Sequence, residues 1–304
     1  MTSSWNNIKC LVTGYGFVSK RLVRKLLSLG ADITVIEKAY VPDSALDNNV
    51  SFINQDLRDL RDEWEFDYVF HLAAVANPGY AERNPGEAFE ANVLGTLNLL
   101  RRVKVNKLLF FSSSSNVYGD TGGALSESSP ISPINTYGVT KMAAEELIKV
   151  WRRKVGTPYA IVRFFTLYGP GSAPMYIIPQ LCIQALRDKR IVIRDGSVQR
   201  DFLYVDDAIE LMIKIANSGK QNLITNVGFG RATSIAELAD TVKKTIGDDN
   251  VSITDLHERD PQSPKAQIAD VTYASSYDWQ PSKTLEEGLR PTIEYYRKAL
   301  AFYE

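Results

Sequence analysis

Residues 8–30 read IKCLVTGYGFVSKRLVRKLLSLG, a short β-rich run followed by an amphipathic helix pattern. The apolar run ends at Gly14, and Gly30 stands where a glycine would close the helix. A buried strand that turns through glycine into a helix is the opening of an α/β unit. This stretch therefore predicts an α/β fold whose first strand is buried.

The first half of the chain repeats this alternation. Further strands are expected at 31–37, 50–56, 66–74, 107–115 and 159–169, with helices at 87–103 and from Tyr137 onward. Strands that alternate with helices specify a Rossmann-type, doubly wound parallel sheet, in which ligands bind beyond the carboxyl ends of the strands. The residues expected to meet at that edge are Gly14, Glu37, Asp56, Ala73, Ser114 and Thr166.

The chain changes character near residue 168, where the turn-rich stretch YGPGSAP is followed by shorter, mixed elements. We expect residues 1–168 to form the Rossmann domain and residues 203–230 to return to it. Residues 169–202 and 231–304 are expected to form a smaller, substrate-binding C-terminal lobe.

Composition excludes several classes of function. Thirty-five Lys and Arg against 36 Asp and Glu leave a net charge of −1, so nothing favours a nucleic-acid partner. Two cysteines, Cys10 and Cys182, fit a reducing cytosol, and two distant histidines argue against a metal site. The N-terminus lacks a signal-peptide pattern, and no stretch approaches the roughly 18 apolar residues of a membrane span. We expect a cytoplasmic protein with no membrane partner.

The turn at residues 14–19 predicts a dinucleotide site. Its two glycines allow a tight turn and close approach of a pyrophosphate, and Ser19 takes the place of a third small residue. Glu37, at the end of the second strand, can accept hydrogen bonds from ribose hydroxyls and would repel a 2′-phosphate. The acidic residue favours NAD over NADP, although the neighbouring Lys38 could offset its charge. The alternative interpretation of the glycine turn is an ordinary connection between a strand and a helix.

A second candidate site is the pair Tyr137 and Lys141 at the start of a predicted helix. Residues four apart share a helix face, so the Lys141 ammonium can lie beside the Tyr137 phenol. A phenol ordinarily titrates near pH 10, and lowering its pKa to about 7 requires roughly 4 kcal/mol of preferential stabilisation of the phenolate. A nearby ammonium is a source of such stabilisation. The alternative interpretation is an ordinary surface pair.

Together these residues resemble the extended short-chain dehydrogenase/reductase family, in particular its nucleotide-sugar epimerase and dehydratase branch. The resemblance extends over the whole chain and includes landmarks in the expected order. They are DYVFHLAA, NVLGTLNLL, FSSSSNVYG, RFFTLYGPG, GSVQRDFLYVDD and DWQPSKTLEEGL.

The resemblance implies a role for each matching residue. Tyr137 matches the catalytic acid/base, Lys141 the residue that tunes it and holds the nicotinamide ribose, and Ser114 the hydroxyl that contacts the sugar. The positions that match NAD contacts are Gly14, Gly16, Phe17, Val18, Glu37, Asp56, Leu57, Ala73, Ala74, Tyr137 and Lys141. Those that match substrate contacts are Ser114, Thr166, Arg200 and Arg259, the two arginines on the diphosphate. Asn92 is expected to support the backbone of the site.

Two positions narrow the reaction that the resemblance implies. Dehydratases of this branch carry an Asp-Glu pair where this chain has Ser115 and Asn116, and related decarboxylases commonly have glutamate at the second position. The resemblance therefore implies an NAD-dependent epimerase that acts at C4 through a 4-keto sugar. The alternatives are a 4-ketoreductase, dehydrogenase or decarboxylase, and a non-catalytic NAD-binding protein. By analogy with relatives, helices 87–103 and 137–154 are expected to form a homodimer.

Overall fold

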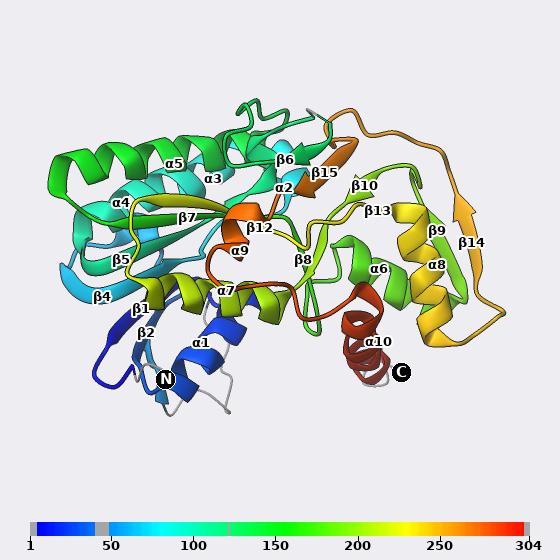
Figure 1. Cartoon of the computed structure of the whole chain (residues 1–304), viewed down its shortest axis with the longest axis horizontal. Coiled ribbons are helices and arrows are strands. Elements are labelled where there is room, and N and C mark those ends of the chain that lie inside the picture. Colours follow the sequence, from blue (N-terminus) through cyan, green and yellow to red (C-terminus); the bar gives the residue numbers. More distant parts are fainter. Residues whose placement is uncertain (1–4, 40–48, 121, 301–304) are drawn as a thin grey trace. The chain divides into compact units, whose positions relative to one another are not determined.

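The computed structural model describes residues 5–39, 49–120 and 122–300 (Figure 1). Its largest sheet has seven strands in the order β12-β7-β5-β4-β1-β2-β3, and the pairings from β3 to β7 are all parallel. The strands are β1 (Lys9–Thr13), β2 (Asp32–Ile36), β3 (Ser51–Ile53), β4 (Trp64–His71), β5 (Val103–Ser114), β7 (Tyr159–Phe164) and β12 (Leu223–Val227). This order confirms the predicted Rossmann-type, doubly wound sheet.

Helices cover both faces of this sheet (Figure 1). Helix α1 (Phe17–Leu29) lies on one face and ends at Gly30, whose positive φ of 91° allows the left-handed cap. Helices α4 (Gly95–Arg102) and α5 (Thr136–Val155) lie on the other. They share an apolar core with β5, which includes Leu99, Leu109 and Ala144.

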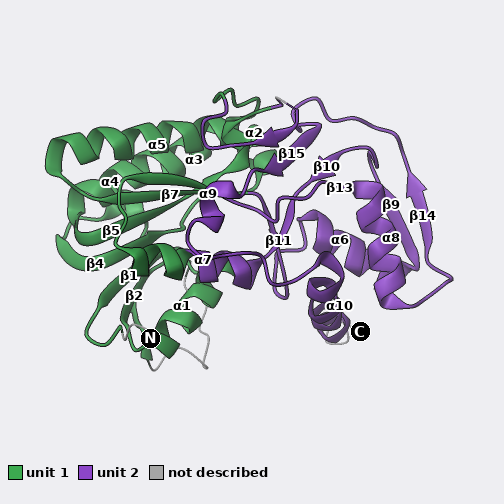
Figure 2. Ribbon diagram, viewed as in Figure 1, with its two compact units in different colours: residues 1–119, 130–164, 212–225 green, residues 120–129, 165–211, 226–304 purple. Residues whose placement is uncertain are grey.

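The chain divides into two compact units, formed by residues 1–119, 130–164 and 212–225 and by residues 120–129, 165–211 and 226–304 (Figure 2). These bounds differ from the expected domains because two short strands pair outside the seven-stranded sheet. Strand β8 (Thr166–Tyr168) pairs with β11 (Phe202–Tyr204), and β6 (Ala124–Leu125) pairs with β15 (Ala266–Ala269). The binding role expected of the smaller lobe stays a prediction.

The second unit is built from short strands and amphipathic helices. Its four-stranded sheet has the order β13-β10-β15-β6, and β14 pairs with β9. The other elements are β9 (Arg190–Ile193), β10 (Gln199–Arg200), β13 (Thr233–Ser234), β14 (Ser252–Asp255), α6 (Ile177–Ile183), α8 (Ile235–Ile246), α9 (Thr272–Ser275) and α10 (Leu285–Leu300). Helix α7 (Val205–Ser218) begins in the second unit and, from Met212 onward, belongs to the first. Helix α8 begins with a capping box between Ser234 and Glu237.

Three predicted elements were wrong in detail. The helix expected at 87–103 is divided into α3 (Pro85–Phe89), a π-helical turn η3 (Glu90–Leu94) and α4, because one extra residue is accommodated in the turn. The strand expected at 159–169 ends at Phe164, after which the amide of Phe165 donates to the carbonyl of Val227. Strand β5 begins at Val103, not at 107, and the short helix α2 (Pro78–Arg83) was not predicted.

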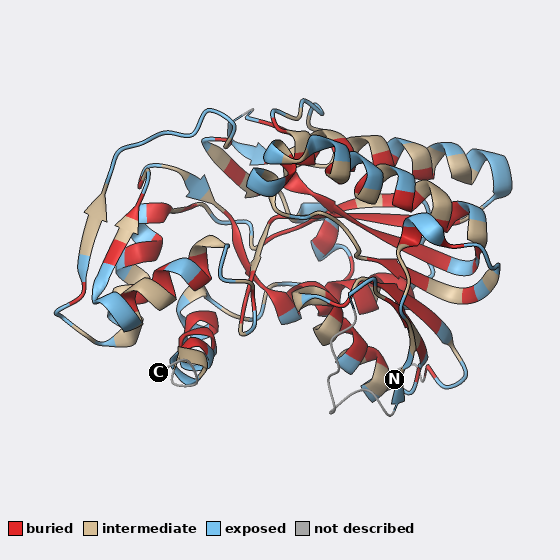
Figure 3. Cartoon of the chain, turned by 180° about the vertical axis from the view of Figure 1, so that it is seen from behind, coloured by how far each residue is buried: buried red, intermediate tan, exposed pale blue. Residues whose placement is uncertain are grey.

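The strands of the seven-stranded sheet are largely buried, as the red segments of Figure 3 show. Phe110 on β5 is fully buried and stacks on Phe70 of β4 with 4.8 Å between ring centroids. Within the described residues, no helix combines the length and apolar character needed to cross a bilayer.

Truncation of this ring pair provides a test of the core. We expect Phe110→Ala to lower the free energy of unfolding by about 3–5 kcal/mol, because it leaves a cavity among close-packed strands. Phe110→Leu keeps most of the apolar volume and is expected to cost about 1 kcal/mol. Urea unfolding followed by circular dichroism measures both, and equal losses in the two variants would contradict this account.

Candidate active site

Lys141 is a buried lysine, 2% exposed, on α5. Its ammonium donates a 2.7 Å hydrogen bond to the carbonyl oxygen of Ser112 on β5 and lies 5.8 Å from the centroid of the Tyr137 ring. Burial lowers the pKa of Lys141 to about 7, while the Glu145 carboxylate acts to raise it. The structure thus brings the two predicted residues Tyr137 and Lys141 together on one helix face.

Ser114, the last residue of β5, is connected to the start of α5 by two asparagines. Its hydroxyl oxygen accepts from the backbone amide of Asn116 at 3.2 Å and from its side-chain amide at 3.1 Å. The side-chain oxygen of Asn116 accepts from Asn135 at 3.0 Å, and Asn135 caps α5 by accepting from the amide of Gly138. Both acceptor positions of Ser114 are used, so its hydrogen is directed away from Asn116.

Asn92, inside the π-helical turn, holds the backbone beside this helix. It accepts from the amide of Val75 at 2.7 Å, and its side-chain nitrogen donates to the Val75 carbonyl and to Thr140. Thr140 in turn donates to the carbonyl of Tyr137 at 2.8 Å. Asn92 therefore supports the backbone of the site, as the sequence predicts.

His71, at the end of β4, is a buried neutral side chain. Thr96 donates to the carbonyl of Asn92, so its oxygen accepts from Nε2 of His71 at 2.8 Å, and Thr13 donates to Nδ1 at 2.7 Å. Burial, with a contribution from Lys141, lowers the pKa of His71 to about 3. In the described part of the chain, no three His, Cys, Asp or Glu side chains are grouped as metal ligands.

The glycine turn has the space that a dinucleotide requires. Gly14 has φ +80°, and a Cβ there would lie 2.9 Å from Cα of Ala73, so only glycine fits. A Cβ on Gly16 would meet nothing within 4 Å, and within the described residues no side chain caps α1 at this end. The open space and the uncapped amides of Phe17 and Val18 fit the pyrophosphate of NAD. Ser19 is buried in the first turn, as its small size allows.

Two acidic side chains lie at the ends of the next strands. Glu37 accepts from the amide of Tyr15 in the glycine turn at 2.7 Å, which directs its carboxylate toward the turn. Asp56, which precedes the buried Leu57, accepts from the backbone and guanidinium of Arg58. The hydrogen bond from Arg58 holds the pKa of Asp56 below its usual value, although burial opposes the shift.

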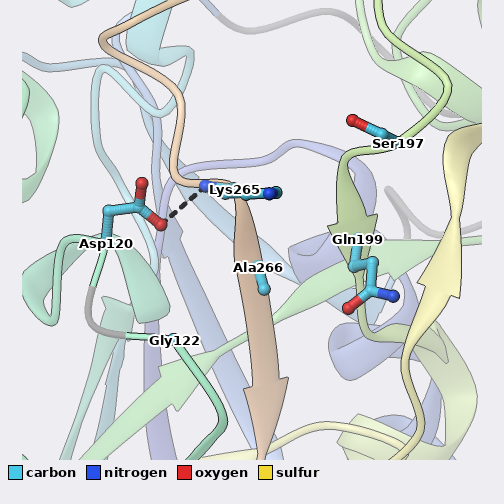
Figure 4. A pocket seen from close by; sticks show the side chains of 6 residues that line it. All are labelled: Asp120, Gly122, Ser197, Gln199, Lys265 and Ala266. Carbon is cyan, nitrogen blue, oxygen red and sulfur yellow. Dashed lines mark hydrogen bonds between the residues drawn. The ribbon is translucent and has the colours of Figure 1, made fainter.

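The predicted arginines lie together in the second unit. Arg200 donates to the hydroxyl of Ser263 at 2.6 Å, while Arg259 donates to its carbonyl and to Asp120, each at 3.2 Å. Burial and the charge of Arg259 lower the pKa of Arg200 to about 10, and Asp120 acts to raise it. The carboxylate of Asp120 also accepts from the amide of Lys265 (Figure 4).

An open cavity of about 430 Å³ lies beside this cluster (Figure 4). The residues that line it are Asp120, Gly122, Ser197, Gln199, Lys265 and Ala266. Gln199 precedes Arg200 on β10. Because successive side chains of a strand point to opposite faces, Gln199 lines the cavity and Arg200 does not. Asp120 is the residue shared by the cavity and the arginine cluster.

Thr166 lies two residues beyond the end of β7, which stops at Phe164. Thr166 lies on β8 in the second unit, since its amide donates to the carbonyl of Asp201 and it pairs with Phe202. It therefore does not extend β7 at the edge of the seven-stranded sheet. Ala73 and Ala74 do follow β4 at that edge, where the amide of Ala73 donates to Thr13.

The sequence prediction missed a buried ion pair next to the site. Arg163 on β7 donates to the two carboxylate oxygens of Glu145 at 3.0 and 2.7 Å, and both side chains are at most 3% exposed. The spacing of Glu145 one helical turn after Lys141 could have indicated that Glu145 is near the site. No local sequence pattern indicated its partner Arg163, which lies 18 residues further along the chain.

The chain is similar in sequence to known proteins over most of its length. Residues 10–228 match the model of the NAD dependent epimerase/dehydratase family. A putative UDP-glucose 4-epimerase of Methanocaldococcus jannaschii is 32% identical, with 94% of this chain and 97% of that protein covered. UDP-glucuronic acid decarboxylase 6 of Arabidopsis thaliana is 31% identical, with 97% and 90% covered.

A solved structure shares both fold and length with this chain. It is the UDP-glucuronic acid 4-epimerase of Bacillus cereus in complex with UDP-glucuronic acid and NAD. The two proteins are 28% identical, the TM-score is 0.88, and the match covers 96% of this chain and 100% of that one.

The two glycines of the turn permit a matched test. We expect Gly16→Ala to keep the wild-type melting temperature, since its φ is ordinary, but to weaken NAD binding at least about tenfold, or about 1.4 kcal/mol. Gly14→Ala is expected to lower both, because the strained backbone destabilises the fold. Calorimetric titration and thermal unfolding measure these effects, and unchanged NAD affinity in Gly16→Ala would contradict the assignment.

Proposed function

Because the chain belongs to the NAD dependent epimerase/dehydratase family, we propose that it is an NAD-dependent epimerase that inverts C4 of a UDP-sugar. The 4-epimerases among its relatives and the arrangement of Ser114, Tyr137 and Lys141 support this proposal. The residues proposed to hold the cofactor are Gly14, Gly16, Phe17, Val18, Glu37, Asp56, Leu57, Ala73, Ala74, Tyr137 and Lys141.

In the proposed mechanism, Tyr137 as phenolate takes the proton of the C4 hydroxyl. The Lys141 ammonium stabilises that phenolate, and Ser114 donates a hydrogen bond to the sugar oxygen. When bound, NAD would supply the acceptor for the C4 hydride and the donor that returns it to the opposite face. Tyr137 then gives its proton back to the C4 oxygen, so the residue ends in its starting state.

The observation that carries epimerisation is the environment of Ser114. Asn116 donates to Ser114 through its side-chain nitrogen and accepts from Asn135 through its oxygen. An ionised carboxylate at this position has no donor, so it could not make the first of these contacts. The amide therefore suits a site that only moves the C4 proton, and neither Ser115 nor Asn116 offers an acid for elimination.

Arg200 and Arg259 are proposed to hold the diphosphate while the 4-keto sugar turns. Guanidinium groups form paired hydrogen bonds with phosphate oxygens. Their common contact with Ser263 supports this role, because it keeps the two cations close together. The second unit would then be the nucleotide-sugar lobe, with Thr166 on β8 as a further substrate contact.

A second candidate is decarboxylation of a UDP-sugar acid, favoured by the identity with the plant decarboxylase. Ketoreduction and net dehydrogenation are related alternatives that would consume a cofactor. Decarboxylation differs from epimerisation by the carbon dioxide it releases, and the two redox reactions differ by the cofactor that they oxidise or reduce. Epimerisation in the absence of added NAD leaves the absorbance at 340 nm unchanged and produces no carbon dioxide.

A Tyr137→Phe variant tests the proposed chemistry. Wild-type protein with UDP-glucose or UDP-glucuronic acid and no added NAD is expected to interconvert the C4 epimers, as followed by NMR. The variant is expected to retain NAD binding and to lose about 10²- to 10⁴-fold in kcat, because proton transfer is lost. Full activity in the variant would indicate that the phenol takes no part.

The proposal extends to a homodimer formed through residues 87–103, which run from α3 through η3 into α4, and through residues 137–154 of α5. Phe89 ends α3, Leu94 ends η3 and Val150 lies on α5, and their side chains are 42%, 53% and 47% exposed. Large apolar side chains left exposed on both segments support an interface there, because burial of apolar surface drives protein association.

Charges on this surface test the dimer. We expect Leu94→Glu combined with Val150→Glu to convert a dimer to a folded monomer in sedimentation velocity, because buried charges oppose association. Leu256→Glu, at a position 44% exposed in the second unit, is the matched control and is expected to remain dimeric. A monomeric wild-type protein at micromolar concentration would contradict this assignment.

A further inference from the structure

The carboxylate of Glu145 is held by three hydrogen bonds inside the first unit. Its Oε1 accepts from the hydroxyl of Ser113 and from Nε of Arg163, and its Oε2 accepts from Nη2 of Arg163. Arg163 also donates to the hydroxyl of Tyr118 at 2.9 Å. Burial opposes the charge of Arg163, but the hydrogen bonds and charge of Glu145 keep its pKa above the ordinary value.

This fixed carboxylate lies one helical turn after Lys141 on α5. Residues at i and i+4 are neighbours on a helix surface, so the two side chains share one buried environment. Lys141 nevertheless donates to the carbonyl of Ser112, and its ammonium lies near the rings of Phe111 and Tyr137. Glu145 therefore acts on Lys141 through its charge, while its hydrogen bonds are used by Arg163 and Ser113.

Among the residues that the structure describes, the other charged and titratable groups packed around Lys141 include no second carboxylate. On β4, His71 is neutral because burial and Lys141 lower its pKa to about 3. On β7, Arg163 is a cation, and on α5 the phenol of Tyr137 is the group to be ionised. Tyr118, which follows β5, contacts Arg163, since its hydroxyl oxygen accepts from the Arg163 guanidinium. Glu145 is thus the carboxylate that can compensate a buried ammonium here.

We propose that Glu145 is a positioning residue that keeps Lys141 charged, and that Arg163 holds the Glu145 carboxylate so that it does not draw Lys141 away from Tyr137. The inference rests on the proposed function for the use of the Lys141 charge. The position of the charge itself does not depend on that function. An ammonium that kept its charge but paired directly with Glu145 would no longer point toward the phenol.

Three variants separate the two parts of this proposal. Glu145→Gln removes the anion and is expected to lower the pKa of Lys141 by about one unit or more. Glu145→Met with Arg163→Met removes both charges, which avoids an unpaired buried ion, and is expected to lower that pKa in the same direction. Arg163→Met alone releases the carboxylate toward Lys141, so the pKa is expected to rise while activity falls.

The charge of Lys141 is followed by two measurements, the first of which does not depend on enzyme activity. Titration of ¹³Cε-labelled lysine by NMR gives the pKa of Lys141 directly, with Lys141→Met to identify its resonance. The second readout is the pH dependence of kcat/KM. If the charged form is required, activity falls as pH rises through the pKa of Lys141, so this decline moves to lower pH in Glu145→Gln.

Glu146→Gln is the matched control, because Glu146 is the next residue on the same helix and its side chain is 62% exposed in a pair with Lys149. Solvent screens that carboxylate, so the Lys141 titration is expected to stay unchanged. The proposal is overturned if folded Glu145→Gln and the double variant both titrate like wild type, or if Arg163→Met leaves the pKa unmoved. If the Lys141 titration shifts as expected in the variants but the wild-type protein shows no epimerase activity, the proposed function alone is refuted.

Discussion

The hydrogen bond from the Lys141 ammonium to the carbonyl oxygen of Ser112 is the contact on which the geometry of the site depends. It joins α5 to the carboxyl end of β5. Tyr137 precedes Lys141 by one helical turn, and Ser114 follows Ser112 by two positions on the strand. Together with the contacts of Ser113 with Glu145 and of Asn116 with Asn135, it sets the register between the two elements that carry the proposed catalytic residues. The same contact holds the Lys141 ammonium in the interior, and a buried cation costs free energy unless a negative group compensates its charge. The Glu145 carboxylate, held by Arg163 on the neighbouring strand, is the compensation that this fold contains.

Much of the fold followed from local sequence signals. A β-rich run that ends in Gly14 and a helix pattern that ends at Gly30 specify β1 and α1, because the positive φ at these two positions favours glycine. The alternation of strands and helices then leaves a parallel, doubly wound sheet as the simple solution. The pair Tyr137 and Lys141 was predictable for the same reason, since four residues make about one helical turn. These predictions depend on short stretches of chain, and the structure agrees with them.

Features that depend on distant partners were not predictable in this way. The π-helical turn at Asn92 is stabilised by contacts with Val75 and Thr140, which no local pattern indicates. Thr166 leaves the large sheet because β8 finds its partner in β11, nearly forty residues later. The pairing of Glu145 with Arg163 likewise joins two elements that only the folded sheet brings together. The sequence contained each of these residues, but the contact that gives each its role is tertiary.

The central claim is that the protein inverts C4 by removing and returning the same hydride. It is tested most directly with UDP-glucose that carries deuterium at C4, incubated with the protein and no added NAD. The account predicts that the C4 epimer forms and retains its deuterium at C4, with none released to solvent. Loss of the label to water, accumulation of reduced cofactor or release of carbon dioxide from UDP-glucuronic acid in place of epimerisation would contradict it.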